Sequence, residues 1–279
     1  MSRWRGSLLS SKVDFDPSFR YETSWLVSPA LLFSLRALFS LYAFVTLFTV
    51  FGWNGAHGLS EESEHSFSYF TDLTYWGLAF YYAFSALHSC SYWLTGTPLL
   101  ARWPRTLQIA HSMFYSTITV YPWIVTIVYW ALLFSGSFPS SFSTWTNTSQ
   151  HGLNAFYALF EIVIPRTDPL SWINLVPIII ILALYLGLAY LTLETEGFYV
   201  YDFLDSRTNS QGIVAGYIIG ILAAAIIVFL IVRYVIKFRV WITEQKLGKT
   251  GKFTNCLHTP PADKEAQNEL QPMPKEGRI

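Results

Sequence analysis

The sequence predicts an all-α fold, a polytopic integral membrane bundle of about six transmembrane helices. Three observations predict it: 52% of the 279 residues are hydrophobic, only 13% are charged, and the apolar residues gather into six long stretches. A bilayer core about 30 Å thick is crossed by about 20 mostly apolar residues in a helix. Because lipid offers no hydrogen-bond partners, the backbone of each stretch has to pair with itself, as a helix does.

Each predicted span is bounded by polar or turn-forming residues. The first carries a single charge, Arg36, the fourth is short for a crossing, and the sixth is the most uniformly apolar. Pro122 in the third span and Pro177 in the fifth are ordinary, because neighbouring helices satisfy the freed backbone groups. The predicted spans are residues 29–53, 69–94, 107–134, 151–165, 172–193 and 212–232.

The chain divides into three predicted regions. Residues 1–28 form a basic cytosolic segment expected to lie at a membrane surface, and residues 29–245 form the transmembrane domain. Residues 246–279 are polar and rich in proline, so they are predicted to be a disordered cytosolic tail. The two cysteines form neither a disulfide framework nor a metal-ligand spacing. The formal net charge of zero gives no support for nucleic-acid binding.

The distribution of Lys and Arg predicts the orientation. Basic residues are concentrated in the two terminal segments and in the loops after the second and fourth spans, whereas the other loops contain only Arg207. The positive-inside rule therefore places both termini in the cytosol. The endoplasmic reticulum or another endomembrane is the expected location. The glycosylation acceptor at Asn147 is expected in a lumenal loop.

Polar clusters lie at the lumenal ends of spans two, four and five. A charge inside the membrane needs a partner, so Arg36 is expected to pair with Asp72 or Glu161 rather than with a lipid phosphate. Polar residues within the membrane are costly and are candidates for function. The three clusters hold, respectively, Thr71, Asp72 and Thr74; His151, Asn154 and Glu161; and Glu194 and Glu196.

Two interpretations of these clusters remain open. A Thr hydroxyl becomes a useful nucleophile beside a base, and imidazole is the usual base, so Thr71 and His151 are candidate catalytic residues. Alternatively, Thr71 and Thr74 bond back to the preceding helical turn, and the residues before His151 cap the fourth span. Taken by themselves, the residues favour capping and packing over catalysis.

Five short segments resemble those of a known family. Residues 68–71 (Ser-Tyr-Phe-Thr) open a helix, and Tyr121-Pro122 and Tyr129-Trp130 follow in the next one. Residues 150–154 (Gln-His-Gly-Leu-Asn) and 196–202 (Glu-Gly-Phe-Tyr-Val-Tyr-Asp) come later in the same order. Over roughly residues 66–245 the chain is similar to the androgen-induced and androgen-dependent TFPI-regulating protein family, which has fungal members.

The resemblance implies a chemistry. Animal members of that family are integral membrane threonine hydrolases that cleave fatty acid esters of hydroxy fatty acids, so Thr71 is implied as the nucleophile. The family's catalytic His falls at Asn154, and only the first His of its motif is kept, as His151. His151 is then the base and Asn154 an oxyanion donor. The supporting carboxylates would be Asp72, Glu161, Glu194 and Glu196.

Two functions are therefore expected. The first is lipid-ester hydrolysis in an internal membrane, with membrane lipids and an acyl-lipid substrate as partners and with no metal or organic cofactor. The second is a non-catalytic multi-pass protein that binds lipid or acts as a scaffold, which the Asn at position 154 favours. A transporter is less well supported, because the sequence shows no internal repeat. No protein partner is indicated.

Overall fold

The computed structural model describes residues 14–249, and this part of the chain is helical apart from one isolated β-bridge between Ser24 and Pro165. Six helices are long enough to have extended faces: α1 Pro29–Ala56, α3 Phe70–Thr95, α5 Arg105–Val128, α7 Asn154–Val163, α8 Leu175–Glu196 and α9 Gln211–Val240. Short helices connect or extend them: α2 Ser60–His65, α4 Leu99–Arg102 and α6 Ser141–Thr148. Three π-helical turns continue helices, η2 Tyr129–Leu133, η3 Ser149–Leu153 and η6 Trp241–Lys246, and 3-10 turns lie at η1 Ser66–Ser68, η4 Trp172–Asn174 and η5 Asp202–Leu204.

Four helical segments are long and apolar enough to cross a membrane: Pro29–Ala56, Arg105–Leu133, Trp172–Glu196 and Gln211–Lys246. Large apolar side chains on them face outward, including Leu41 (61% exposed), Leu184 (67%) and Ile219 (65%). Apolar surface on this scale is unfavourable in water and ordinary in lipid. The fold is therefore consistent with an integral membrane protein.

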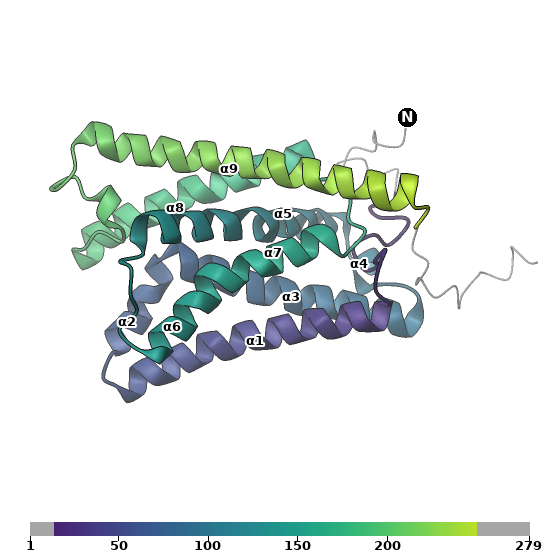
Figure 1. Cartoon of the computed structure of the whole chain (residues 1–279), viewed down its shortest axis with the longest axis horizontal. Coiled ribbons are helices and arrows are strands. Elements are labelled where there is room, and N and C mark those ends of the chain that lie inside the picture. The colour runs from purple at the N-terminus through teal and green to yellow at the C-terminus, as the bar shows by residue number, and fades with distance from the viewer. Residues whose placement is uncertain (1–13, 250–279) are drawn as a thin grey trace, which may run out of the picture.

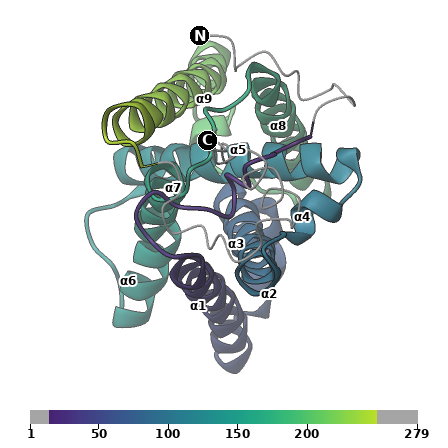
Figure 2. The same cartoon turned by 90° about the vertical axis from the view of Figure 1, so that its right-hand side faces the viewer.

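The long helices run roughly along one axis and form a bundle (Figure 1). Helix α5 lies at its centre and contacts α3, α7, α8 and α9. Helix α1 packs along α3 on one side, and α9 and α8 lie together on the other, as the end-on view also shows (Figure 2). We call the end that holds Arg20, Arg166 and Arg239 the arginine end, and the opposite end, which holds Thr71 and His151, the threonine end.

The fourth predicted helix begins earlier than its sequence suggests. Its N-cap is Ser140, whose side chain accepts a hydrogen bond from the Ser143 amide, and the helix runs through α6, η3 and α7 to Val163. The prediction of a short span starting at His151 was wrong because the π-helical turn carries the helix through a polar stretch. Asn147, expected in a loop, lies inside α6, where its amide nitrogen donates to the Ser143 carbonyl over 2.9 Å.

The sixth predicted helix extends beyond Val232. Helix α9 continues to Val240 and then through η6 to Lys246. Arg239 is buried and donates hydrogen bonds to the carbonyl oxygens of Ile162, Pro165 and Thr167. The positive charge of Arg239 therefore does not end the helix, because backbone carbonyls at the end of α7 and in the segment after it accept its hydrogen bonds.

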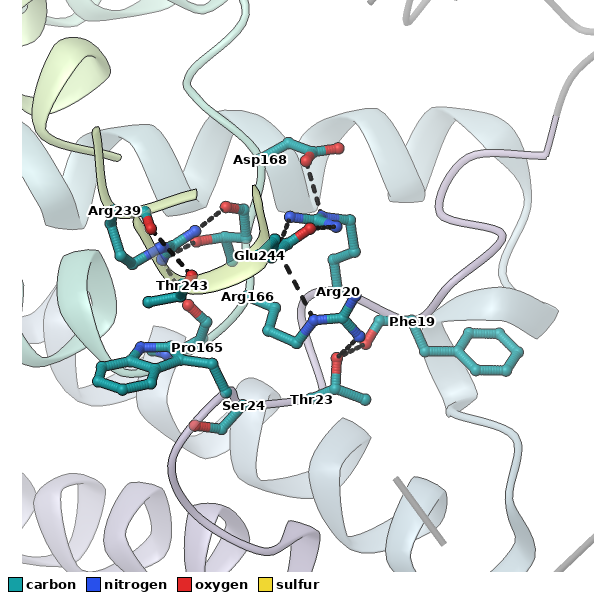
Figure 3. Close-up of polar contacts among 12 residues, drawn as sticks. Phe19, Arg20, Thr23, Ser24, Pro165, Arg166, Asp168, Arg239, Thr243 and Glu244 are labelled. Atoms are coloured by element: carbon teal, nitrogen blue, oxygen red, sulfur yellow. Dashed lines mark hydrogen bonds and ion pairs between the residues drawn. The ribbon is translucent and has the colours of Figure 1, made fainter. Parts of the chain in front are cut away.

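The segment before α1 packs into the arginine end. The Ser24 hydroxyl donates to the Ile164 carbonyl and the Trp25 indole donates to the Val163 carbonyl, each over 2.7 Å. Arg20 lies 2.7 Å from Asp168 and also pairs with Glu244 (Figure 3). Residues 22–24 are buried within the protein. Most of the predicted disordered tail, residues 250–279, lies outside the described residues, as do residues 1–13.

Candidate functional site

Thr71 lies in the first turn of α3, at the threonine end. The preceding residue, Phe70, donates its amide to the Tyr201 hydroxyl over 3.2 Å, which ties the start of α3 to the loop between α8 and α9. Burial raises the pKa of the Tyr201 phenol, and the hydrogen bond from the Phe70 amide is among the contacts that oppose that rise. Thr74 donates to the Thr71 carbonyl over 3.0 Å, which is the back-bonding expected of a helical threonine.

His151 sits in the π-helical turn η3 and is 8% exposed. Its ring stacks on Tyr129, with centroids 3.6 Å apart and planes 18° from parallel. Its Nδ1 lies 3.1 Å from the Asn147 carbonyl oxygen. A carbonyl can only accept, so Nδ1 carries the proton and Nε2 carries the lone pair. This is the tautomer that a general base needs.

The two candidate catalytic residues lie on neighbouring elements but do not bond to each other. Gln150 donates to Asp72 over 2.9 Å, and this contact joins the turn containing His151 to the turn containing Thr71. Successive side chains on an α-helix point about 100° apart, so the contact between Gln150 and Asp72 does not bring their neighbours His151 and Thr71 face to face. Among residues 14–249 no hydrogen bond links Thr71 to His151. The structure brings their elements together and places the His151 side chain against Tyr129.

Asn154, at the family position of the catalytic His, is buried at 3% exposure. Its Oδ1 accepts hydrogen bonds from the Thr126 hydroxyl over 3.0 Å and from the Ala155 amide over 2.7 Å. The carbonyl end of the side chain is therefore committed to α5 and to the first turn of α7. Only its amide nitrogen is chemically able to donate to an oxyanion.

Glu161 is fully buried and pairs with Arg36, which confirms one of the two pairings expected for this arginine. The contact is bidentate, with Nε to Oε1 at 2.8 Å and Nη2 to Oε2 at 2.7 Å. Tyr81 adds a weaker hydrogen bond at 3.3 Å. Glu161 is thus placed to neutralise Arg36, and the His151 ring takes its orientation from Asn147 and Tyr129 instead.

The remaining predicted carboxylates lie apart from His151. Glu194 is exposed near the end of α8. Glu196 lies 3.2 Å from the His65 Nε2 and so joins α8 to the short helix α2. The Glu196 contact braces the loops at the threonine end.

A groove of about 570 Å³ opens between α3, α5 and α8. Its walls are apolar apart from the hydroxyls of two threonines and two tyrosines, and α5 forms its floor. The groove begins near Ala110 and ends near Tyr121, eleven residues later, which spans about 17 Å of helix. The lining includes Leu73, Thr74, Gly77, Met113, Phe114, Thr117, Pro122, Pro177, Ile181 and Leu184.

Hydrogen bonds close this groove at the threonine end. Tyr185 on α8 donates to the Ser68 carbonyl, and Thr192 donates to the Ser68 hydroxyl, each over 3.0 Å. Phe70 packs its ring against Tyr121 and Tyr185 at the same level. Helix α8 therefore meets the start of α3 at the threonine end and diverges from α3 toward the arginine end. Thr71 follows directly after the aromatic cluster that closes the groove.

Sequence reasoning missed the groove and the contact of Tyr201 with the start of α3. Pro122, inside α5, and Pro177, in the first turn of α8, both line the groove, but neither proline by itself predicts one. Tyr201 lies in the segment that resembled the family motif, but no spacing rule places it against the start of α3. Comparison with family models, with curated proteins and with solved structures gives no match.

Proposed function

We propose that this protein is an integral membrane protein that crosses the bilayer six times and holds an acyl chain in the groove between α3, α5 and α8. The six-crossing topology adds α3 and the continuous helix α6–η3–α7 to the four most apolar segments. Their 26 and 23 residues correspond to about 39 and 34 Å of helix, enough to cross the hydrocarbon core. An even number of crossings keeps both termini on one side, the cytosolic side by the charge distribution.

The topology is tested by labelling single cysteines with a membrane-impermeant maleimide in sealed vesicles, in a chain that lacks Cys90 and Cys256. Ser137→Cys, between α5 and α6, and Ser206→Cys, between α8 and α9, are expected to react only after the vesicles are opened. Ala101→Cys, on α4 at the other end, is expected to react from outside in vesicles whose cytosolic face is outward. Reaction of all three from one side would overturn the proposed topology.

The observation that carries the lipid-binding proposal is the shape and chemistry of the groove. It is apolar, it is lined by helices with lipid-facing surfaces, and polar contacts close it at the threonine end. Such a site suits an extended hydrocarbon chain whose polar end lies near Phe70 and Thr71. Sites for small molecules are typically of this size and mostly apolar, with a few polar groups that fix orientation.

The occupant is tested with a photoactivatable fatty acyl probe in nanodiscs, with the labelled peptides identified by mass spectrometry. Gly77→Leu is the informative variant, because a Cβ at Gly77 would point toward the Phe114 ring at 3.8 Å and a longer side chain would fill the groove. Wild-type protein is expected to be labelled on α3, α5 and α8, and Gly77→Leu is expected to lose most of that labelling.

The matched control is Gly187→Leu. It makes the same change on an exposed face of α8, where a Cβ meets nothing within 4 Å and no groove residue is altered. Labelling should be unaffected by this control. Uniform labelling of all lipid-facing surfaces, or equal labelling of the two variants, would overturn the acyl-chain proposal.

A second candidate function, ester hydrolysis, is favoured by the tautomer of His151. With Nδ1 donating to Asn147, the Nε2 lone pair is able to accept the Thr71 proton after a modest rearrangement of the two side chains. The Thr71 oxygen would attack the ester carbonyl carbon and the alcohol would leave with that proton. Water would then release the acid from the acyl-threonine. The resemblance of residues 66–245 to a threonine hydrolase family supports the same chemistry, in an endomembrane.

Fluorophosphonate labelling separates this second function from lipid binding alone. Labelling of the wild type that disappears in both Thr71→Ala and His151→Ala, and persists in Thr195→Ala on α8, is the expected result for a hydrolase. Each variant is first checked by size exclusion. A well-folded wild type that takes no label would leave lipid binding as the function and remove hydrolysis.

A further inference from the structure

A second cavity, of about 420 Å³, lies at the arginine end of the bundle. It is formed by the segment before α1, by α4 and by the first turn of α5. Three carboxylates line it, those of Asp14, Asp16 and Glu22, together with Gln108 and Arg105. Phe15, Phe19, Pro98 and Leu100 make the rest of its wall apolar.

Glu22 is the unexplained group in this cavity. Its side chain is 1% exposed, and within residues 14–249 no other residue donates a hydrogen bond to either carboxylate oxygen. Arg36, a buried cation whose charge acts on Glu22, is already bound to Glu161, Ser89 and the Tyr21 carbonyl. A buried carboxylate without a partner is costly, so a ligand that donates to it has a clear energetic role.

The other polar groups in the cavity wall also present acceptors. Asp16 uses Oδ2 to accept from the Tyr21 amide at 3.1 Å, which leaves Oδ1 able to accept from a ligand. Gln108 donates through Nε2 to the Leu100 carbonyl at 3.1 Å, so its Oε1 is the atom with accepting capacity. Arg105 is the single cation of the lining described, and its guanidinium lies over the Phe15 ring, 5.4 Å from the centroid.

The turn that forms this wall is held in an unusual backbone conformation. Phe19 has a φ of 49°, the left-handed region that residues with a Cβ rarely adopt. Its amide donates to the Asp16 carbonyl at 3.2 Å, and its ring packs against Tyr92. Figure 3 shows the ring directed away from the arginine cluster. Strained backbone of this kind persists where the surroundings fix it, so the cavity wall is preformed.

We propose that this cavity binds a primary ammonium group, with Glu22 as the principal acceptor. An ammonium carries three donors and one positive charge, which matches a wall rich in acceptors and in carboxylates. A metal ion fits less well, because among the described residues no three His, Cys, Asp or Glu side chains are grouped closely enough to hold one. The ammonium has two sources, a small soluble amine or the headgroup of an aminophospholipid. The proposal is independent of the groove and of its occupant.

The first test measures thermal unfolding of the full chain in detergent with added n-butylammonium chloride. A saturable rise in Tm is expected, and tetramethylammonium chloride at equal ionic strength and 1-butanol are expected to give none, because neither donates as an ammonium does. Glu22→Gln replaces an accepting oxygen with a donor and should weaken butylammonium binding about tenfold or more. Glu64→Gln, at an exposed carboxylate on α2, is the matched control and should bind normally.

The second test repeats the Tm measurement in phosphatidylcholine nanodiscs with and without phosphatidylethanolamine. A rise with phosphatidylethanolamine that Glu22→Gln abolishes assigns the site to a lipid headgroup; a rise with butylammonium alone assigns it to a soluble amine. Asp16→Asn is the second variant, should Glu22→Gln fail to fold, and it is expected to weaken binding as well. No rise with either amine, an equal rise with tetramethylammonium, or full binding by the Glu22→Gln variant would overturn the proposal.

Discussion

Polar side chains inside this bundle bond to one another and to backbone carbonyls. Arg36 is 1% exposed and donates to both Glu161 oxygens, to the Ser89 hydroxyl at 2.7 Å and to the Tyr21 carbonyl at 2.8 Å. These contacts join α1, α3, α7 and the segment before α1. Arg233 differs, because it is only partly buried and lies over the Trp172 ring, 4.5 Å from its centroid.

We therefore expect Arg36→Leu to destabilise the protein far more than Arg233→Leu. Removing one partner of a buried pair leaves an uncompensated charge, which costs about 3–5 kcal/mol. Thermal unfolding in detergent, with the yield of monodisperse protein, measures the difference. The double variant Arg36→Leu, Glu161→Leu should recover part of the lost stability, because it removes both charges. Equal tolerance of the two single changes would show that the buried pair contributes little.

The second residue-scale prediction concerns Asp16, which lies before the first helix. Burial raises its pKa from 3.8 to about 6. The folded state therefore holds the Asp16 proton more tightly than the unfolded state, and the stabilisation from this proton is complete below about pH 4 and is lost as the pH rises through 6.

Asp16→Asn keeps the acceptor for the Tyr21 amide and removes the charge. Its Tm should exceed that of the wild type at pH 7.5, and the two should converge at pH 4. Asp14→Asn, at an exposed carboxylate nearby, is the control and should alter neither value. A constant difference between Asp16→Asn and the wild type across this range would contradict the assignment.

At the scale of elements, two features of helix ends build the threonine end. The π-helical turn η3 carries α6 into α7 and turns Gln150 toward Asp72 and His151 toward Tyr129. Gly197 ends α8 with a φ of 80°, and its amide donates to the Leu193 carbonyl at 3.0 Å. That cap directs the chain into the loop that brings Tyr201 to the start of α3.

Two glycines of α8 should therefore respond in opposite ways to alanine. Gly197→Ala places a Cβ in the left-handed region and is expected to lower stability by about 1–2 kcal/mol. Gly187→Ala lies within the helix where a Cβ meets nothing, and should be neutral or stabilising by about 0.5–1 kcal/mol. Thermal unfolding of the two variants decides the point. If both substitutions changed the free energy of unfolding in the same direction, the left-handed conformation at Gly197 would not disfavour a Cβ.

At the scale of the whole molecule, contacts between the two ends of the described chain hold the arginine end together. Lys249 donates its amide to the Thr243 carbonyl at 2.8 Å, which finishes η6, and Arg20 and Arg166 both face Glu244. We expect truncation after Lys249 to leave the fold intact, since residues 250–279 are polar and rich in proline. Size exclusion in detergent measures this, and loss of the monodisperse peak would show that the tail docks.

The helical class, the approximate position of each long helix and the need of Arg36 for a buried partner could be predicted from the sequence. These are local properties, because apolar length fixes helices in lipid and an isolated charge there demands compensation. The helix boundaries near polar residues were less predictable. Ser141 and Val240 lie beyond the apolar stretches, and what extends the helices to them is a cap, a π-helical turn and carbonyl partners for Arg239.

What the sequence by itself determined is thus an all-helical protein with apolar, lipid-facing helices and a small set of polar residues gathered near their ends. Only the tertiary structure decided which partners those residues contact: Glu161 pairs with Arg36, Asp72 with Gln150, and His151 with Tyr129 and Asn147. It alone also decided that α3 and α8 meet at one end and diverge to form a groove, and that Glu22 faces a cavity. The physical reason is that such contacts join residues far apart in sequence, where helix packing rather than spacing sets which side chains meet.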